Sequence, residues 1–170
     1  MRVLQPLIAW THRLRPRLML DILRTQISRT VPFARHLGVS VEEMQAGRAR
    51  TLLVEKPELL NHVGTFHAGA VFTACEAASG AALVAVLAPV VMQVRFVVRD
   101  ATIDYLKAAR GALHAQATVV DEIEPVLQAL EAAGRVEVAI DVCARGAKDE
   151  VVAKATFNWV VRRAPDAAKA

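Results

Sequence analysis

The feature of this 170-residue chain that most restricts its fold is a long apolar segment with almost no charge. Between residues 68 and 93 the only ionisable side chains are Cys75 and Glu76. The segment is long enough to span a bilayer, but a carboxylate near its middle would be costly there. Nine of the fifteen residues 68–82 are Ala or Gly. We therefore predict a helix over residues 67–87 enclosed by a protein sheet, since such a helix is also apolar on every side; a membrane span is the alternative.

Strand patterns surround this helix. The expected strands cover residues 37–44, 48–55, 94–106, 112–120, 135–145 and 151–161, and a short helix is expected at 125–133. Within 135–145, Val138, Ile140 and Val142 alternate with Ala139, Asp141 and Cys143, which is typical of a strand with one buried face. Strands grouped around one long helix indicate an α+β protein with an antiparallel sheet of about six strands.

The composition is typical of one globular domain. Hydrophobic residues make up 54% of the chain and charged residues 22%, which argues against disorder. We expect an N-terminal basic helical arm at 1–32, a domain at 33–163 and a frayed tail at 164–170. The only cysteines, Cys75 and Cys143, give no disulfide framework, so we expect a reducing, cytoplasmic compartment.

The arm carries much of the formal net charge of +4. Between residues 2 and 35 there are seven arginines and one acid, Asp21. Such an arm can bind nucleic acid or an anionic membrane. No aromatic interleaving or nucleic-acid motif accompanies it, so we expect a solvated helix face and no nucleic-acid partner. Association of the arm with a membrane is the remaining alternative.

The start of the long helix has the features of an anion-stabilising site. A loop containing Gly64 leads into it near His67, and the first N–H groups of a helix lack partners inside the helix. The positive end of the helix dipole lies at the same place. The small residues Ala68 and Gly69 let a substrate approach these N–H groups, and Asn61 and His67 add hydrogen-bonding side chains. Such a place stabilises an oxyanion.

Glu76 lies two to three turns into the helix. Burial should raise the pKa of its carboxyl group, which suits a general base near neutral pH; a purely structural carboxylate is the alternative. His67 and Glu76 are nine residues apart, which places them on opposite faces and about 13–14 Å apart along the axis. If both act on one small substrate, Glu76 must meet the helix N-terminus of a second subunit, with two equivalent sites by symmetry.

The run of Asn61, Gly64, Thr65, His67 and Gly69, followed by an acid nine residues after the histidine, resembles the hot-dog thioesterases of the phenylacetate-pathway (PaaI-like) branch. The resemblance covers roughly residues 33–162. It implies an antiparallel sheet wrapped around one long helix, a homodimer that often pairs into a tetramer, and hydrolysis of acyl-CoA thioesters. It implies no cofactor and no metal, since coenzyme A is part of the substrate.

The resemblance also implies roles for single residues. Glu76 matches the acid that activates water or attacks the thioester carbonyl, and Asn61 and His67 match residues that position the reactants. The backbone at Ala68 and Gly69 matches the oxyanion site, and Gly64, Thr65 and Val98 match positions that contact substrate. The chain departs from the family in having Ala68 where glycine is usual, Glu76 where this branch more often has Asp, and Val98 where some relatives have Ser or Thr. The arm and the insertion at 122–134 lie outside the usual core.

Other functions stay open on the sequence. The chain could bind acyl-CoA without hydrolysing it, an alternative that the departures at Ala68 and Val98 leave open, or act as a hot-dog hydratase or dehydratase. Cys75 is expected to be a buried structural thiol, and the histidines lack metal-ligand spacing. Four basic residues could either receive CoA phosphates or be ordinary surface charge: Arg95, Arg99, Lys107 and Arg110.

Overall fold

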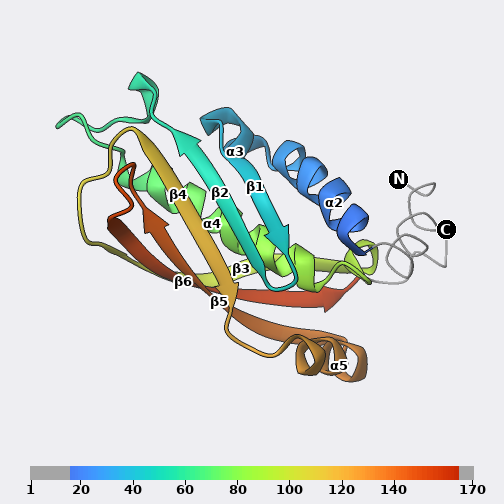
Figure 1. Ribbon diagram of the computed structural model, residues 1–170. Helices are drawn as coiled ribbons and strands as arrows, with labels where there is room; N and C mark the ends of the chain where they lie inside the picture. Colours follow the sequence, from blue (N-terminus) through green and yellow to red (C-terminus); the bar gives the residue numbers. More distant parts are fainter. Residues whose placement is uncertain (1–15, 165–170) are drawn as a thin grey trace.

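The computed structural model describes residues 16–164, in which helices and strands follow one another as the α+β prediction requires (Figure 1). The helices are α2 (Pro16–Thr30), α3 (Pro32–Leu37), α4 (Ala68–Val86) and α5 (Ile123–Ala133), with 3₁₀ helices at Pro57–Leu59 and Val91–Gln93. The strands are β1 (Ser40–Gln45), β2 (Arg48–Val54), β3 (Val94–Tyr105), β4 (Ala112–Val119), β5 (Arg135–Arg145) and β6 (Val151–Arg163). The predictions for residues 1–15 and 165–170 lie outside the described residues.

The six strands form one antiparallel sheet in the order β1-β2-β4-β5-β6-β3. Helix α4 lies against one face of this sheet, where it packs on β2, β4 and β5, and the sheet curves around it (Figure 1). Strands β1 and β3 are the two edges. The predicted six-stranded sheet around a single long helix is confirmed.

The composition of α4 explains how a helix can occupy this place. Its Ala and Gly residues let the helix axis approach the sheet closely, and most of its length is buried. The fully buried Thr51 of β2 donates a hydrogen bond of 2.9 Å to the carbonyl of Ala74 in mid-helix. This bond fixes the helix against the sheet without leaving a buried hydroxyl unpaired.

Burial of α4 also bears on the membrane alternative. The helix is long and apolar enough to cross a membrane, with a mean hydropathy of 1.6, yet 78% of that window is buried inside the protein. Its apolar surface is therefore already covered by the sheet, as expected for a core helix.

The predicted alternation in β5 is confirmed as well: Val138, Ile140 and Val142 are buried and Asp141 is exposed.

Helix α2, the described part of the basic arm, lies along β1 and beside α4 (Figure 1). Met19 and Leu23 are buried on its inner side, whereas Leu18 and Asp21 are exposed. Arg24 donates a hydrogen bond of 3.2 Å to the carbonyl of Val41 in β1. Helix α2 is thus solvated on one face only, and its other face belongs to the core.

The structure contains a short helix, α3, that was not predicted, and Leu37, which was expected to begin a strand, is its last residue. Pro32 opens the helix at its first turn, a position proline tolerates because that N–H has no partner inside the helix. Gly38 ends the helix with φ 84°, and its N–H bonds the carbonyl of Arg35. Strand β1 therefore begins at Ser40, three residues later than expected.

Candidate active site

The loop before α4 is held in one shape by its own hydrogen bonds. The Oδ1 atom of Asn61 accepts from the N–H groups of Val63 and Thr65, both at 3.1 Å, and its Nδ2 donates to Oγ1 of Thr65 at 2.9 Å. Gly64 turns the chain with φ 72°. The carboxamide oxygen of Asn61 is therefore fully used, and one amide hydrogen is left for a substrate or water.

The N-terminus of α4 presents one free backbone donor. His67 caps the helix: its Nδ1 accepts from the N–H of Gly69 at 3.0 Å. A Cβ at Gly69 would lie 3.2 Å from that Nδ1, so glycine lets the ring come this close. Among the described residues nothing accepts from the N–H of Ala68, which is exposed at the positive end of the helix dipole. Of the two predicted oxyanion donors, Ala68 is free and Gly69 is occupied.

Two residues that the sequence did not assign to this place lie around it. The hydroxyl of Tyr105, at the end of β3, donates to the carbonyl of Ala68 at 3.2 Å. Arg110 donates to the carbonyl of Val63 at 3.3 Å and lies over Gly64. Tyr105 is the only tyrosine of the chain, but no spacing in the sequence relates either residue to the helix N-terminus.

Glu76 is half-buried in the middle of α4. Burial raises the pKa of its carboxyl group above the usual range. Among the side chains that the structure describes, none hydrogen-bonds or ion-pairs with this carboxylate, and removal from water is the cause of the shift. A structural carboxylate is normally satisfied by a partner, so an unpartnered one with a raised pKa has the properties of a functional acid or base.

Glu76 lines an apolar cavity of about 280 Å³. The cavity is bounded by α2, by the segment from Val31 through α3 to β1, by one face of α4 and by the region around the start of β3, and Glu76 is the only ionisable residue among the described side chains that line it. The lining residues are Leu23, Gln26, Ile27, Thr30, Val31, Ala34, Val39, Val41, Thr73, Glu76, Ala77, Gly80, Val84, Val91, Met92, Phe96 and Trp159. An apolar pocket with one perturbed acid is a common form of a binding site for an apolar ligand.

The predicted site residues fall into two groups within one chain. Asn61, Thr65, His67 and Ala68 lie together at the start of α4, and Glu76 lies eight residues further along, about 12 Å by the rise of the helix. Val98 is half-buried on β3, opposite Trp159 in the sheet register, and is not among the described residues that line the cavity. One chain thus holds both chemical parts of the predicted site but does not bring them together.

Cys75 is buried inside the protein. Burial, and to a smaller extent Cys143, raises the pKa of its thiol to about 12. A thiol with that pKa is almost wholly protonated at neutral pH and is a poor nucleophile. This agrees with the predicted structural role.

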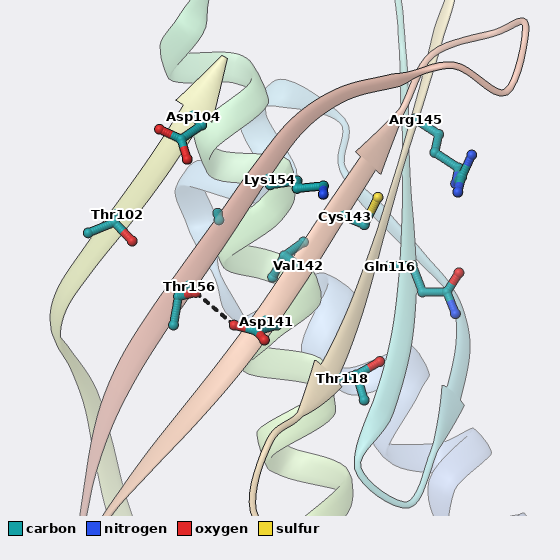
Figure 2. Close-up of a pocket in the computed structure, with 11 residues that line it drawn as sticks. Thr102, Asp104, Gln116, Thr118, Asp141, Val142, Cys143, Arg145, Lys154 and Thr156 are labelled. Carbon is teal, nitrogen blue, oxygen red and sulfur yellow. Dashed lines mark hydrogen bonds between the residues drawn. The ribbon is translucent and has the colours of Figure 1, made fainter. Parts of the chain in front are cut away.

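The outer face of the sheet carries a different kind of hollow, a polar groove of about 490 Å³. Figure 2 shows Asp104, Arg145 and Lys154 projecting from the strands that line it, and Thr156 donating to Asp141 at 2.7 Å. Its acids and bases are mixed, and it lies on the face of the sheet away from Glu76. We therefore place the candidate site at the cavity and not at this groove.

The basic residues considered for phosphate binding lie apart. Arg99 is ion-paired with Asp100 at 2.6 Å and with Glu137. Arg95 stands opposite Arg162 in the register of β3 and β6. Of the four, Arg110 is the one that lies against the loop before α4. In the described part of the chain no three His, Cys, Asp or Glu side chains gather in a way that could hold a metal ion.

Comparison with solved structures identifies the architecture as the hot-dog fold. A Pseudomonas aeruginosa protein of unknown function, described as a probable thioesterase, aligns with a TM-score of 0.72 at 21% identity, covering 85% of this chain and 95% of that one. The Escherichia coli PaaI protein from the phenylacetic acid degradation operon aligns with a TM-score of 0.65 at 18% identity, covering 93% and 94%. A hypothetical thioesterase from Streptococcus pneumoniae, solved with coenzyme A, aligns with a TM-score of 0.58 at 24% identity, covering 75% and 89%.

A family model matches residues 21–161, so the chain belongs to the family described as Domain of unknown function (DUF4442). The matched range includes residues 21–30, the last two-thirds of α2, which are therefore part of the family's domain. A search of the curated proteins found no match.

Proposed function

We propose that the protein is an acyl-CoA thioesterase in which Glu76 is the catalytic carboxylate and the N–H of Ala68 polarises the thioester carbonyl. The observation that carries the proposal is the unpartnered, half-buried carboxylate of Glu76 with its raised pKa at an apolar cavity. The products are a free acid and coenzyme A.

The chemistry of the acid supports this reaction. A carboxyl group with a raised pKa is a stronger base when ionised, and it can take a proton from a water molecule that attacks the thioester carbon. The proton passes on to the departing thiolate, so the step needs no redox group. Attack by the carboxylate itself, through a mixed anhydride, places the same residue in the same position.

The free N–H of Ala68 supplies the complementary part. Negative charge develops on the carbonyl oxygen in the transition state, and a fixed donor at the positive end of a helix of 19 residues stabilises it. The hydrogen bond from Gly69 to His67 fixes the first turn of α4, so that this donor keeps its direction. Alanine at position 68 can donate this hydrogen bond as glycine would, because both residues have a backbone N–H.

A second copy of the chain would bring the two parts together. Glu76 and Ala68 are about 12 Å apart along one helix, which is too far for one carbonyl. Among the described strands β3 is paired on one side only, with β6, and its Val97 is 65% exposed; such an edge invites pairing with another strand. In the proposed homodimer, Glu76 of one subunit faces Ala68 of the other. Pairing of two such dimers into a tetramer would add no group that the proposed hydrolysis requires.

The coenzyme portion of the substrate would lie outside the apolar cavity. The Streptococcus pneumoniae hypothetical thioesterase, which shares the fold, was solved with coenzyme A. Arg110 is exposed beside the loop that leads to Ala68, and a guanidinium there is suited to a phosphate group.

Release of free thiol from acyl-CoAs, measured for the wild type and for Glu76→Gln, tests the proposal. The amide keeps the size of the side chain but cannot act as a base, so we expect kcat to fall by roughly 10²- to 10⁴-fold. Glu131→Gln, at an exposed glutamate of α5, is the matched control and should keep full activity.

Wild-type protein that binds a non-hydrolysable thioether analogue of acyl-CoA but releases no thiol from any thioester would assign the fold a binding role. Equal turnover by Glu76→Gln would remove the carboxylate from the mechanism.

A further inference from the structure

We infer that helix α2 forms one wall of the acyl site, and that the site takes a straight aliphatic acyl chain of medium length. This rests on the proposed function, because the chain is placed by its thioester group next to Glu76. The inference concerns residues 23–30, which lie outside the six-stranded sheet and its central helix.

The cavity has four walls of different origin. Leu23, Gln26 and Ile27 face it from α2, at the spacing of one helical face. The second wall is a stripe of α4 formed by Thr73, Glu76, Ala77, Gly80 and Val84. The third comes from the region around β3 and β6 and is formed by Val91, Met92, Phe96 and Trp159. The fourth comes from the region around α3 and β1 and is formed by Val31, Ala34, Val39 and Val41. Without α2, the stripe of α4 that carries Glu76 would be open to water on that side.

The wall formed by Trp159 is rigid. Its indole N–H donates to Oγ of Ser79 at 3.1 Å inside the core, and its ring meets Phe96 edge-on with centroids 5.9 Å apart. A Cβ at Gly80 would lie 3.4 Å from the indole ring, so glycine lets the ring pack directly on α4. The wall formed by Leu23 and Ile27 belongs to a helix at the protein surface, so substitutions there can change the shape of the cavity.

The chemistry of the lining selects the acyl class. Apart from Glu76, its polar side chains are Gln26, Thr30 and Thr73, and the Thr73 hydroxyl already donates to the carbonyl of Gly69 at 2.8 Å. Most of the described lining is Val, Leu, Ile, Ala and Met, and its two aromatic side chains, Phe96 and Trp159, pack edge-on against each other. An unsubstituted aliphatic chain is the ligand that leaves no polar group unpaired in such a lining.

The volume sets the length. A cavity of 280 Å³ has room for roughly nine methylene-sized groups, taking ~30 Å³ for each as for a water molecule in the liquid. We therefore expect affinity to rise about fourfold with each added carbon up to a length of roughly eight to ten carbons, and to level off beyond.

Two substitutions at Ile27 test the wall in opposite directions. Ile27→Trp fills the cavity and should lower kcat/KM for decanoyl-CoA by about tenfold or more while leaving butanoyl-CoA within about twofold. Ile27→Ala enlarges it and should move the preferred length upward. Leu18→Trp, at an exposed position of the same helix, is the control and should leave the length profile unchanged.

Calorimetric binding of non-hydrolysable thioether analogues, from butanoyl to hexadecanoyl, separates this inference from the proposed function. A length optimum that Ile27→Trp shortens supports the wall even if thiol release is absent. Thiol release with the same length profile in wild type and both Ile27 variants overturns the wall and leaves the thioesterase standing. Loss of the oligomer in Ile27→Trp, together with equal loss at every length, would assign the cavity to a subunit contact and also overturn it.

Discussion

Replacing Ala68 with proline removes one backbone N–H from the start of α4 and leaves the rest of the helix able to form. Proline is tolerated at the first helical position because that N–H bonds no carbonyl inside the helix. The residue before a proline must be extended, with ψ between about +120° and +160°, and His67 already has φ −61° and ψ 139°. We therefore expect the variant to fold with a change in unfolding free energy of less than about 1 kcal/mol.

The effect on catalysis should be much larger than the effect on stability. The N–H of Ala68 is the donor left free at this helix end, since that of Gly69 is bonded to His67. Removal of a single oxyanion donor lowers kcat by about 10²- to 10³-fold, or about 3–4 kcal/mol. The loss should appear in kcat and much less in KM, because the donor acts on charge that develops in the transition state.

Steady-state thiol release measures this, with thermal unfolding as the check on folding. Ala68→Gly keeps the N–H and should retain kcat within about threefold. A fully active Ala68→Pro protein would refute the assignment of the Ala68 N–H, and a protein that loses its thermal transition would point to a structural role for this turn.

Three further predictions concern buried groups. Because burial raises the pKa of Glu76, the folded wild type loses stability as pH rises through that raised pKa, whereas Glu76→Gln does not. At acidic pH the melting temperatures of the variant and the wild type should therefore be the same, and above pH 7 the variant should have the higher melting temperature. A difference in melting temperature that does not change with pH would contradict this. Thr51→Val removes the bond to Ala74 and should cost about 1 kcal/mol in urea unfolding, and an unchanged midpoint would show that the bond contributes nothing. Iodoacetamide should alkylate Cys143 and spare Cys75 in the folded protein, as peptide mass spectrometry would show.

Most of the fold could be predicted from the sequence because its elements have strong local signals. The apolar stretch of α4 predicts a helix buried on every side, and the alternation in β5 predicts a strand with one buried face. Helix α3 could not be found this way, because six residues are too short for a helical period and Pro32 marks either a break or a first turn.

The candidate site was predicted in part for the same reason. Asn61, His67 and Glu76 carry chemistry that can be recognised in a sequence, and the roles proposed for them stay predictions. What the sequence did not contain is the competition for hydrogen bonds: the Asn61 oxygen is taken up by its own loop, and Gly69 is bonded to His67. The cavity depends on packing between segments far apart in the chain, such as Ile27 against α4, which no local pattern encodes.

The most direct test of the account mixes two inactive subunits, Ala68→Pro and Glu76→Gln. If each site takes Ala68 from one subunit and Glu76 from the other, a mixed dimer contains one site with both residues intact. Random reassociation makes half of the dimers mixed, so thiol release should recover to about a quarter of the wild-type rate. No recovery, with mixed dimers demonstrated by differently tagged subunits, would contradict a site shared between Ala68 and Glu76 of two subunits.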